Sequence, residues 1–122
     1  MAYDDQNTFA RILRGEIPCD KVYENDHALA FRDIAPLAPV HVLVIPKGRY
    51  VAYDDFAAEA TAAELADFMR ALGAVARKLG VTAKGSRILS NQGVDGRQEI
   101  PHFHVHLFAG KNLGRMIKPV DK

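Results

Sequence analysis

The segment 102–107 alternates strictly between histidine and an apolar residue, in the order His-Phe-His-Val-His-Leu. Successive side chains of a β-strand point to opposite faces of a sheet, so this alternation predicts a strand over residues 101–108. One face would carry the three imidazoles, and the other, with Phe103, Val105 and Leu107, would meet a hydrophobic core. The chain must therefore build a sheet with one face packed against other elements.

Residues 61–79 show the clearest helical pattern in the chain. Thr61 and Glu64 have the spacing of a capping box, in which each side chain accepts a hydrogen bond from the other residue's backbone N–H. Apolar residues then recur at intervals of three and four, which predicts a helix with one apolar face in the core. That face consists of Leu65, Phe68, Met69, Leu72, Val75, Ala76 and Leu79.

Shorter elements are predicted on both sides of this helix. A short helix begins near Asn7 or Thr8 and ends at Gly15, and Pro18 prevents its continuation. Strands are predicted over residues 21–24, 27–32, 40–45 and 86–91, and a polar loop over residues 92–99. The fold class is therefore α+β: an antiparallel sheet of about five strands with its helices on one side. We treat residues 1–122 as one domain with a tail from about residue 110.

Composition argues against several classes of protein. The 16 basic and 15 acidic residues give a net charge of +1, which favours neither nucleic acid nor a membrane surface as a partner. The single cysteine, Cys19, cannot form an intrachain disulfide, as expected in a reducing compartment. The N-terminal segment lacks the pattern of a signal peptide. We therefore expect a cytoplasmic protein.

A face of histidines suits two kinds of chemistry. A His-x-His pair can place two nitrogens on one zinc ion, but His102 and His106 would lie about 13 Å apart along a strand, too far to share one ion. A metal site would need an adjacent pair of these histidines together with His41 or a carboxylate from elsewhere, and the metal-dependent alternative uses His102 or His104 with His41. The second possibility is nucleophilic attack by a neutral imidazole whose other nitrogen is held protonated by a neighbour. The spacing alone leaves both possibilities open.

The loop that precedes the histidines carries groups that bind phosphate. It contains Asn91, Gln92, two glycines and Arg97. Amides, backbone N–H groups and a guanidinium can hold phosphate oxygens without a metal. An ordinary hairpin loop is the competing interpretation.

The pattern His-φ-His-φ-His-φ-φ at residues 102–108, in which φ is apolar, resembles that of the histidine triad (HIT) family. Residues 9–18, 30–36 and 38–47 are similar to segments of its Hint branch, so the likeness covers nearly the whole chain. It implies a HIT-like fold, a homodimer, and cleavage at the α-phosphate of purine nucleoside phosphoramidates or adenylates with release of AMP. We expect no cofactor and no metal.

The resemblance also implies roles for individual histidines. By position, His104 matches the nucleophile that becomes nucleotidylated, and His106 matches a residue that contacts the α-phosphate. His41 and His102 match supporting histidines, one of which would fix the tautomer of His104. These four histidines form the predicted catalytic group.

A second set of residues matches the nucleotide-binding positions of the family. Asp33 matches the carboxylate that accepts the ribose hydroxyls, with Ile34 beside it, and Asn91 matches a contact of the α-phosphate. Four apolar residues match the surroundings of the purine: Phe9, Ile12, Ile17 and Phe31. Gln98 and Glu99 complete the predicted set on the loop before the triad.

Three features depart from the family pattern. The Hint branch usually has Gly-Gln-Ser before the triad, whereas this chain has Arg97, Gln98 and Glu99. A carboxylate at Glu99 would repel phosphate unless it were protonated, turned away or paired with Arg97, so the leaving group is open. The chain also lacks the Trp-Pro-Pro ending of some members and the zinc-binding Cys-x-x-Cys of others. A noncatalytic nucleotide-binding or regulatory protein and a dinucleoside polyphosphate hydrolase are the alternative functions.

Overall fold

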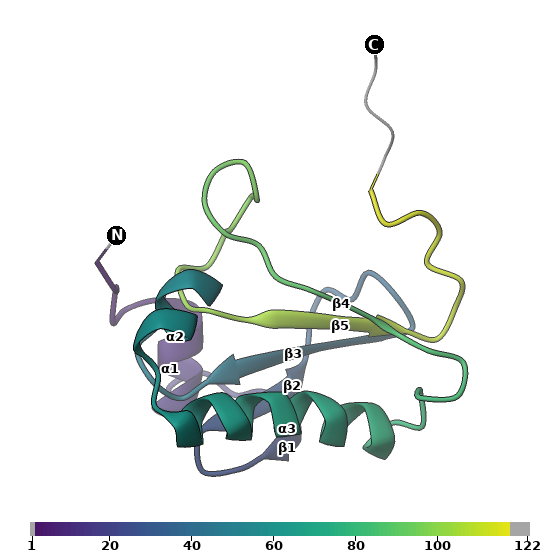
Figure 1. Ribbon diagram of the computed structural model, residues 1–122, viewed down its shortest axis with the longest axis horizontal. Helices are drawn as coiled ribbons and strands as arrows, with labels where there is room; N and C mark the ends of the chain where they lie inside the picture. The colour runs from purple at the N-terminus through teal and green to yellow at the C-terminus, as the bar shows by residue number, and fades with distance from the viewer. Residues whose placement is uncertain (1, 118–122) are drawn as a thin grey trace.

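The computed structural model describes residues 2–117. Within this range the chain forms three α-helices and five β-strands (Figure 1). Their order is α1 (Thr8–Leu13), β1 (Lys21–Glu24), β2 (Ala28–Arg32), β3 (Val40–Pro46), α2 (Tyr53–Glu59), α3 (Ala62–Lys78), β4 (Arg87–Leu89) and β5 (Val105–Ala109). The predicted α+β class is confirmed.

All five strands lie in one antiparallel sheet with the order β1-β2-β3-β5-β4. The last strand of the chain thus lies in the interior of the sheet, between β3 and β4. In the β3–β5 register, His41 faces Phe108 and Leu43 faces His106. This pairing joins two segments that are more than sixty residues apart in sequence, and it brings the histidine of β3 close to the triad.

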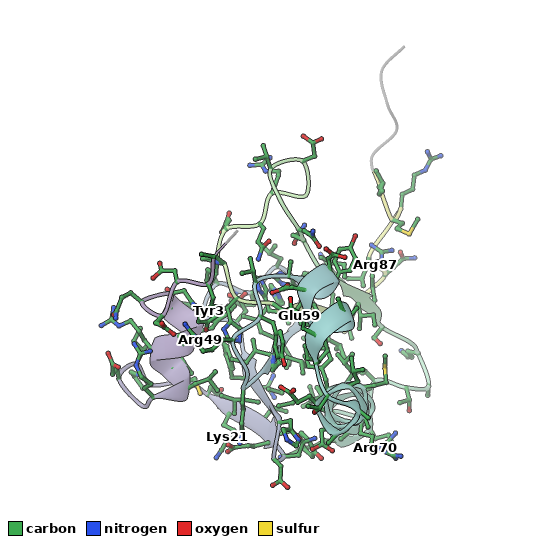
Figure 2. The ribbon with its side chains drawn as sticks, turned by 60° about the vertical axis from the view of Figure 1, so that its left-hand side comes forward. Tyr3, Lys21, Arg49, Glu59, Arg70 and Arg87 are labelled. Atoms are coloured by element: carbon green, nitrogen blue, oxygen red, sulfur yellow. The ribbon has the colours of Figure 1, made fainter. Side chains whose placement is uncertain are left out.

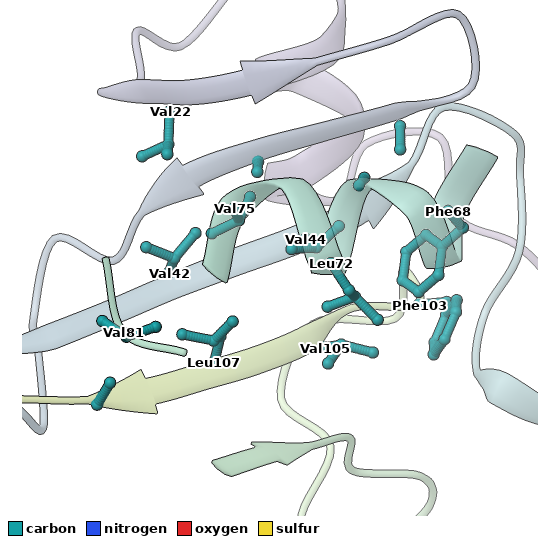
Figure 3. Packing of buried hydrophobic residues seen from close by; sticks show 14 of the residues in the cluster. Val22, Val42, Val44, Phe68, Leu72, Val75, Val81, Phe103, Val105 and Leu107 are labelled. Atoms are coloured by element: carbon teal, nitrogen blue, oxygen red, sulfur yellow. The ribbon is translucent and has the colours of Figure 1, made fainter. Parts of the chain in front are cut away.

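One face of the sheet packs against α3 (Figure 3). The β5 residues Val105 and Leu107 point toward this face, as the alternation predicts, and both are buried. Phe103 packs against two other rings, with its centroid 5.0 Å from those of Phe56 and Phe68. The apolar half of the alternating segment is therefore fixed in the main core.

The opposite face of the sheet packs against α1, and here the predicted arrangement of helices on one side is wrong. Phe9 of α1 joins a second buried cluster with Leu29 and Phe31 of β2 and Leu43 and Ile45 of β3. Strand β2 can supply both clusters because its residues are buried on both faces, with alanines toward α3 and larger residues toward α1. The imidazole face of the sheet is the face beneath α1.

The strand predicted over residues 101–108 is shorter and begins at Val105. Before that point the chain leaves β3, since the backbone N–H of Phe103 bonds the carbonyl of Tyr50 at 2.8 Å. The strand predicted over residues 86–91 is likewise only Arg87–Leu89. Beyond it, the hydroxyl of Ser90 donates to the carbonyl of His104. His102 and His104 thus lie on irregular backbone that side chains help to hold.

The predicted long helix is confirmed, with Thr61 as N-cap and the expected capping box to Glu64. Its apolar stripe is only partly in the core: Phe68, Leu72 and Val75 are buried, whereas Leu65 and Met69 are exposed. Helix α2 was not predicted from sequence. It is short and buries one large side chain, Phe56, so it lacks a periodic pattern.

The segment after β5 has no regular secondary structure up to Ile117. The guanidinium of Arg87 donates to the carbonyl of Gly114 at 2.8 Å and holds this segment against β4. The remainder of the predicted tail lies outside the described residues. None of the helices within residues 2–117 has the length and apolar character needed to cross a membrane.

Candidate active site

A cavity of about 590 Å³ opens on the α1 face of the sheet. Three kinds of groups line it. The imidazoles are His41, His104 and His106; the apolar wall includes Phe9, Ile12, Ile17, Phe31, Ile34, Leu37, Leu43 and Ile100; the polar rim includes Arg32, Asp33, Asn91, Arg97 and Glu99. The structure thus brings together most of the site residues expected from the sequence. His102 and Gln98 do not line this cavity.

The imidazole of His104 is oriented by the chain immediately before it. Its Nδ1 lies 2.7 Å from the carbonyl oxygen of His102. A carbonyl can only accept, so Nδ1 carries the proton, and in the neutral ring Nε2 carries the lone pair. Nε2 has no hydrogen-bond partner among residues 2–117. The ring of Phe9 packs edge-on against His104, with centroids 4.9 Å apart, and limits its rotation.

The tautomer of His106 is fixed by a chain of two hydrogen bonds. The backbone N–H of Leu37 donates to Nδ1 of His41 at 3.1 Å, so His41 carries its proton on Nε2. That proton is donated to Nδ1 of His106 at 2.9 Å. The neutral ring of His106 must then carry its proton on Nε2. The site therefore offers a lone pair on His104 and an N–H donor on the adjacent His106.

His102 lies behind this pair and is completely buried. Its Nε2 donates to the carbonyl of Pro46 at 2.8 Å, and its Nδ1 lies 2.6 Å from the hydroxyl of Tyr3. The sequence predicted that a supporting histidine would fix the tautomer of His104. In the structure the backbone carbonyl of His102, rather than its imidazole, makes that bond.

Burial keeps these histidines neutral near pH 7. It lowers the pKa of His102 and of His106 to about 4. It also lowers the pKa of His41, against the opposing effect of the Asp33 carboxylate. Burial lowers the pKa of His104 too, where the His102 carbonyl and the carboxylates of Asp33 and Glu99 oppose it. A neutral His104 is the form that can act as a nucleophile.

Asp33 follows the last residue of β2, and one of its carboxylate oxygens is hydrogen-bonded to the nearby backbone. Its Oδ1 accepts from the backbone N–H of Ala35 at 2.8 Å, and its Oδ2 lies 3.5 Å from Nε2 of His41. The carboxylate remains half-buried at the cavity wall. In this position the carboxylate can accept further hydrogen bonds from hydroxyl groups, such as those of a ribose.

The loop before the triad uses one predicted residue differently. The amide of Gln98 donates to the carbonyls of Val51 at 2.6 Å and Ile100 at 3.0 Å, so it ties the loop to the α2 side of the molecule. Asn91 bonds the carbonyl of Gly96 across the loop and still reaches the cavity. Gln98 therefore supports the loop. It was predicted to contact the nucleotide, but it does not line this cavity.

Within residues 2–117, one group of side chains has the spacing of metal ligands: Asp33, His41 and His106. This set differs from the predicted alternative, which paired His41 with His102 or His104. Nε2 of His41 and Nδ1 of His106 are 2.9 Å apart, whereas a tetrahedral zinc holds its nitrogen ligands about 3.3 Å apart. A hydrogen bond between the two rings accounts for this geometry.

Comparison with known proteins decides the family. Residues 14–113 match the model of the HIT domain. This chain belongs to the HIT domain family. It is 64% identical over 115 residues to an uncharacterised 13.2 kDa HIT-like protein of Azospirillum brasilense, covering 94% of each chain. It is 38% identical over 113 residues to the purine nucleoside phosphoramidase of Escherichia coli K12, covering 93% of this chain and 94% of that protein.

Solved structures agree with this assignment. A HIT family hydrolase from Clostridium thermocellum superimposes with a TM-score of 0.86 at 36% identity, covering 94% of this chain and 99% of the other. These similarities support a hydrolase-type role for the chain. The match to HIT proteins also confirms the HIT-like fold that the triad pattern implies.

The lowered pKa values predict that the protein loses stability as the pH falls from 6.5 to 4. In this window the unfolded chain takes up protons on its histidines, whereas the folded chain keeps them neutral. The free energy of unfolding therefore decreases as the pH falls. For His102, whose pKa falls to about 4, the loss is about 3 kcal/mol. Urea unfolding at a series of pH values measures it.

The matched control is His102→Gln, which removes one titrating group. Its free energy of unfolding should change less steeply with pH between 6.5 and 4 than that of the natural protein, whatever its absolute stability. Equal slopes in the two proteins would contradict the assignment of His102 as a buried neutral imidazole.

Proposed function

We propose that this HIT protein is a nucleotide hydrolase that cleaves purine nucleoside phosphoramidates or adenylates at the α-phosphorus. The reaction passes through a covalent nucleotidyl-His104 and releases AMP. One observation carries the proposal: His104 donates its Nδ1 proton to the His102 carbonyl and presents an unpaired Nε2 in the cavity. The similarity to the Escherichia coli phosphoramidase supports the choice of substrate.

The chemistry proceeds in two displacements at phosphorus. In the first, the lone pair of His104 Nε2 forms a bond to phosphorus, and the bond from phosphorus to the leaving amine breaks. The amine departs with that electron pair and takes up one proton. In the second, a water oxygen attacks phosphorus, the electrons of the P–N bond return to Nε2, and the water gives up one proton. The net reaction consumes one water.

Neighbouring groups stabilise the phosphoryl oxygens. The Nε2–H of His106 is the donor next to the nucleophile, since the two rings line the same cavity with centroids 5.1 Å apart. His41 holds the His106 ring in the required tautomer. The second amide hydrogen of Asn91 and the guanidinium of Arg97 supply further donors on the loop. Preorganised donors of this kind account for much of the catalysis in phosphoryl transfer.

The rest of the cavity fits a nucleoside. Asp33 accepts the ribose hydroxyls, and the purine lies among Phe9, Ile12, Ile17 and Phe31, with Ile34 at the rim. Ile34 is almost fully exposed at 99%, so a bound nucleotide would cover it. The apolar wall favours a planar base, and the Asp33 carboxylate beside it favours a sugar diol over a second phosphate.

Replacement of the nucleophile gives the direct test. We expect His104→Ala to lower kcat for an adenosine phosphoramidate at least about 10³-fold, because no other imidazole that lines the cavity within residues 2–117 presents a free lone pair. Mass spectrometry after an alkaline quench should detect AMP attached to His104 in the natural protein. His27→Ala is the matched control, since His27 pairs with Asp67 away from the cavity and should keep full activity.

The same assay separates the alternatives. Full activity of His104→Ala would overturn the proposal. Tight AMP binding without turnover of any leaving group would indicate the noncatalytic function, and preference for diadenosine polyphosphates would indicate the polyphosphate hydrolase. Activity that disappears with a chelator and returns with zinc would indicate a metal-dependent reaction at His41.

Glu99 is expected to select the leaving group by charge. Its carboxylate lines the cavity and acts electrostatically on His104, and it takes part in none of the ion pairs of residues 2–117. A negative charge here disfavours a phosphate leaving group relative to an amine. Glu99→Gln should therefore raise kcat/KM for a substrate with a phosphate leaving group by roughly threefold to tenfold relative to a phosphoramidate.

The control for this prediction is Asp95→Asn, because Asp95 lies on the same loop outside the cavity lining. Competition kinetics with the two substrates measure the ratio directly. An unchanged ratio in Glu99→Gln would contradict a role for this carboxylate in selecting the leaving group.

We also propose that the protein is a cytoplasmic homodimer. Strand β4 is an edge strand with Ile88 and Leu89 exposed, at 51% and 37%. On the outer side of α3, Met69 is 64% exposed. An edge with free backbone groups and apolar side chains pairs readily with another strand, and a second copy would cover both surfaces.

Charge placed in this surface should separate the two copies. We expect the natural protein to sediment as a dimer in analytical ultracentrifugation, and Met69→Glu and Ile88→Lys each to shift it toward monomer, because a charge at a packed interface is desolvated without a partner. Val94→Glu, on an exposed loop position, is the control and should leave the dimer intact. A monomeric natural protein would contradict this proposal.

A further inference from the structure

We propose that Tyr3 is a positioning residue of the triad. Its hydroxyl holds His102 in a single tautomer and so fixes the backbone carbonyl that orients His104. This inference rests on the proposed function for its kinetic consequence, but not for its structural basis. Tyr3 is ninety-nine residues from His102 in sequence, and no pattern in the chain links the two.

The hydrogen bonds around His102 define the donor at each atom. The carbonyl of Pro46 lies 2.8 Å from Nε2 and can only accept, so Nε2 carries the proton. Nδ1 is then an acceptor, and the hydroxyl of Tyr3, 2.6 Å away, donates to it. The two rings also meet edge to face, with centroids 5.5 Å apart. His102 is thus held from both sides.

The position of His102 is passed on to the nucleophile through one peptide unit. His102 has no exposed surface and does not line the cavity. Its carbonyl nevertheless accepts the Nδ1 proton of His104 at 2.7 Å. A movement of the His102 ring that shifts this carbonyl would turn the His104 imidazole or release its tautomer. Tyr3 therefore acts on His104 through His102, without lining the cavity in which the nucleotide would bind.

The N-terminal segment is fastened so that Tyr3 can hold this position. Both carboxylate oxygens of Asp5 accept from Arg49 at 2.8 Å, and the guanidinium of Arg49 lies 5.1 Å from the centroid of the Tyr3 ring. Arg14 donates to the carbonyl of Asp5 at 2.8 Å. Figure 2 shows Tyr3 and Arg49 next to each other at this end of the molecule. Terminal residues are usually poorly ordered unless they are tied down in this way.

The alternative is that Tyr3 only fills space beside His102. Phenylalanine fills nearly the same space but cannot donate a hydrogen bond, so it separates the two roles. In Tyr3→Phe, the Nδ1 of His102 would remain as a buried acceptor without its donor, and the ring would be free to exchange tautomers.

The experiment compares Tyr3→Phe with Tyr53→Phe, a change at an exposed tyrosine of α2. In Tyr3→Phe we expect kcat for an adenosine phosphoramidate to fall by up to about tenfold, with KM unchanged within about twofold because Tyr3 does not line the cavity. Imidazole ¹⁵N NMR should show the His102 signals displaced and the Nδ1–H tautomer of His104 less populated. Tyr53→Phe should leave all of these unchanged.

Other outcomes overturn the inference. These are an unchanged kcat, a rise in KM at constant kcat, and a loss of kcat without any change in the His102 and His104 imidazole signals. If the natural protein hydrolyses no phosphoramidate, the proposed function fails, and the NMR comparison then decides the role of Tyr3 by itself. Displaced His102 and His104 signals in Tyr3→Phe would support it, and unchanged signals would overturn it.

Discussion

The hydrogen bond from His104 Nδ1 to the carbonyl of His102 is the interaction on which the site depends. It determines which nitrogen of His104 carries the lone pair, and it exists because the chain is not a regular strand at this point. In an antiparallel ladder that carbonyl would point toward a neighbouring strand. Here strand β5 begins only at Val105, and the carbonyl of His102 accepts from the side chain of His104, two residues along the chain. The irregular backbone is therefore part of the chemistry.

Much of the fold follows from local patterns in the sequence. The alternation at residues 102–107 correctly separates the side chains that face α3 from the imidazoles, because that separation needs only an extended backbone. The start of β5 could not be predicted, since it depends on the hydrogen bond that the backbone N–H of Phe103 donates to the carbonyl of Tyr50. Helix α2 was missed because its one buried large residue, Phe56, gives no periodicity, and Met69 fits the core pattern of α3 although the helix turns it outward.

The sequence predicts which residues form the site, but not the hydrogen bonds that join them. The triad and the carboxylate at Asp33 were identified by resemblance to the HIT family, and the structure gathers His41, His104, His106 and Asp33 around one cavity. The relation between Leu37, His41 and His106 depends on the β3–β5 register and on a loop that no spacing rule describes. Gln98 shows the converse, since it stands among site residues in sequence and bonds backbone carbonyls outside the cavity.

Burial is the main reason why the histidines of the cavity are neutral, and the charges around them are balanced. Two arginines, Arg32 and Arg97, and two carboxylates, Asp33 and Glu99, line the cavity, so it has no excess of positive charge to attract a phosphate. Burial would make a protonated His106 costly, and its pKa of about 4 reflects that cost. Neutral N–H donors that are already oriented avoid this cost, and they bind the phosphoryl oxygens without weakening the lone pair of His104. With the nucleotide held by shape and by these donors, and with Asp33 assigned to the ribose, Glu99 is the other carboxylate of the cavity and can distinguish one leaving group from another.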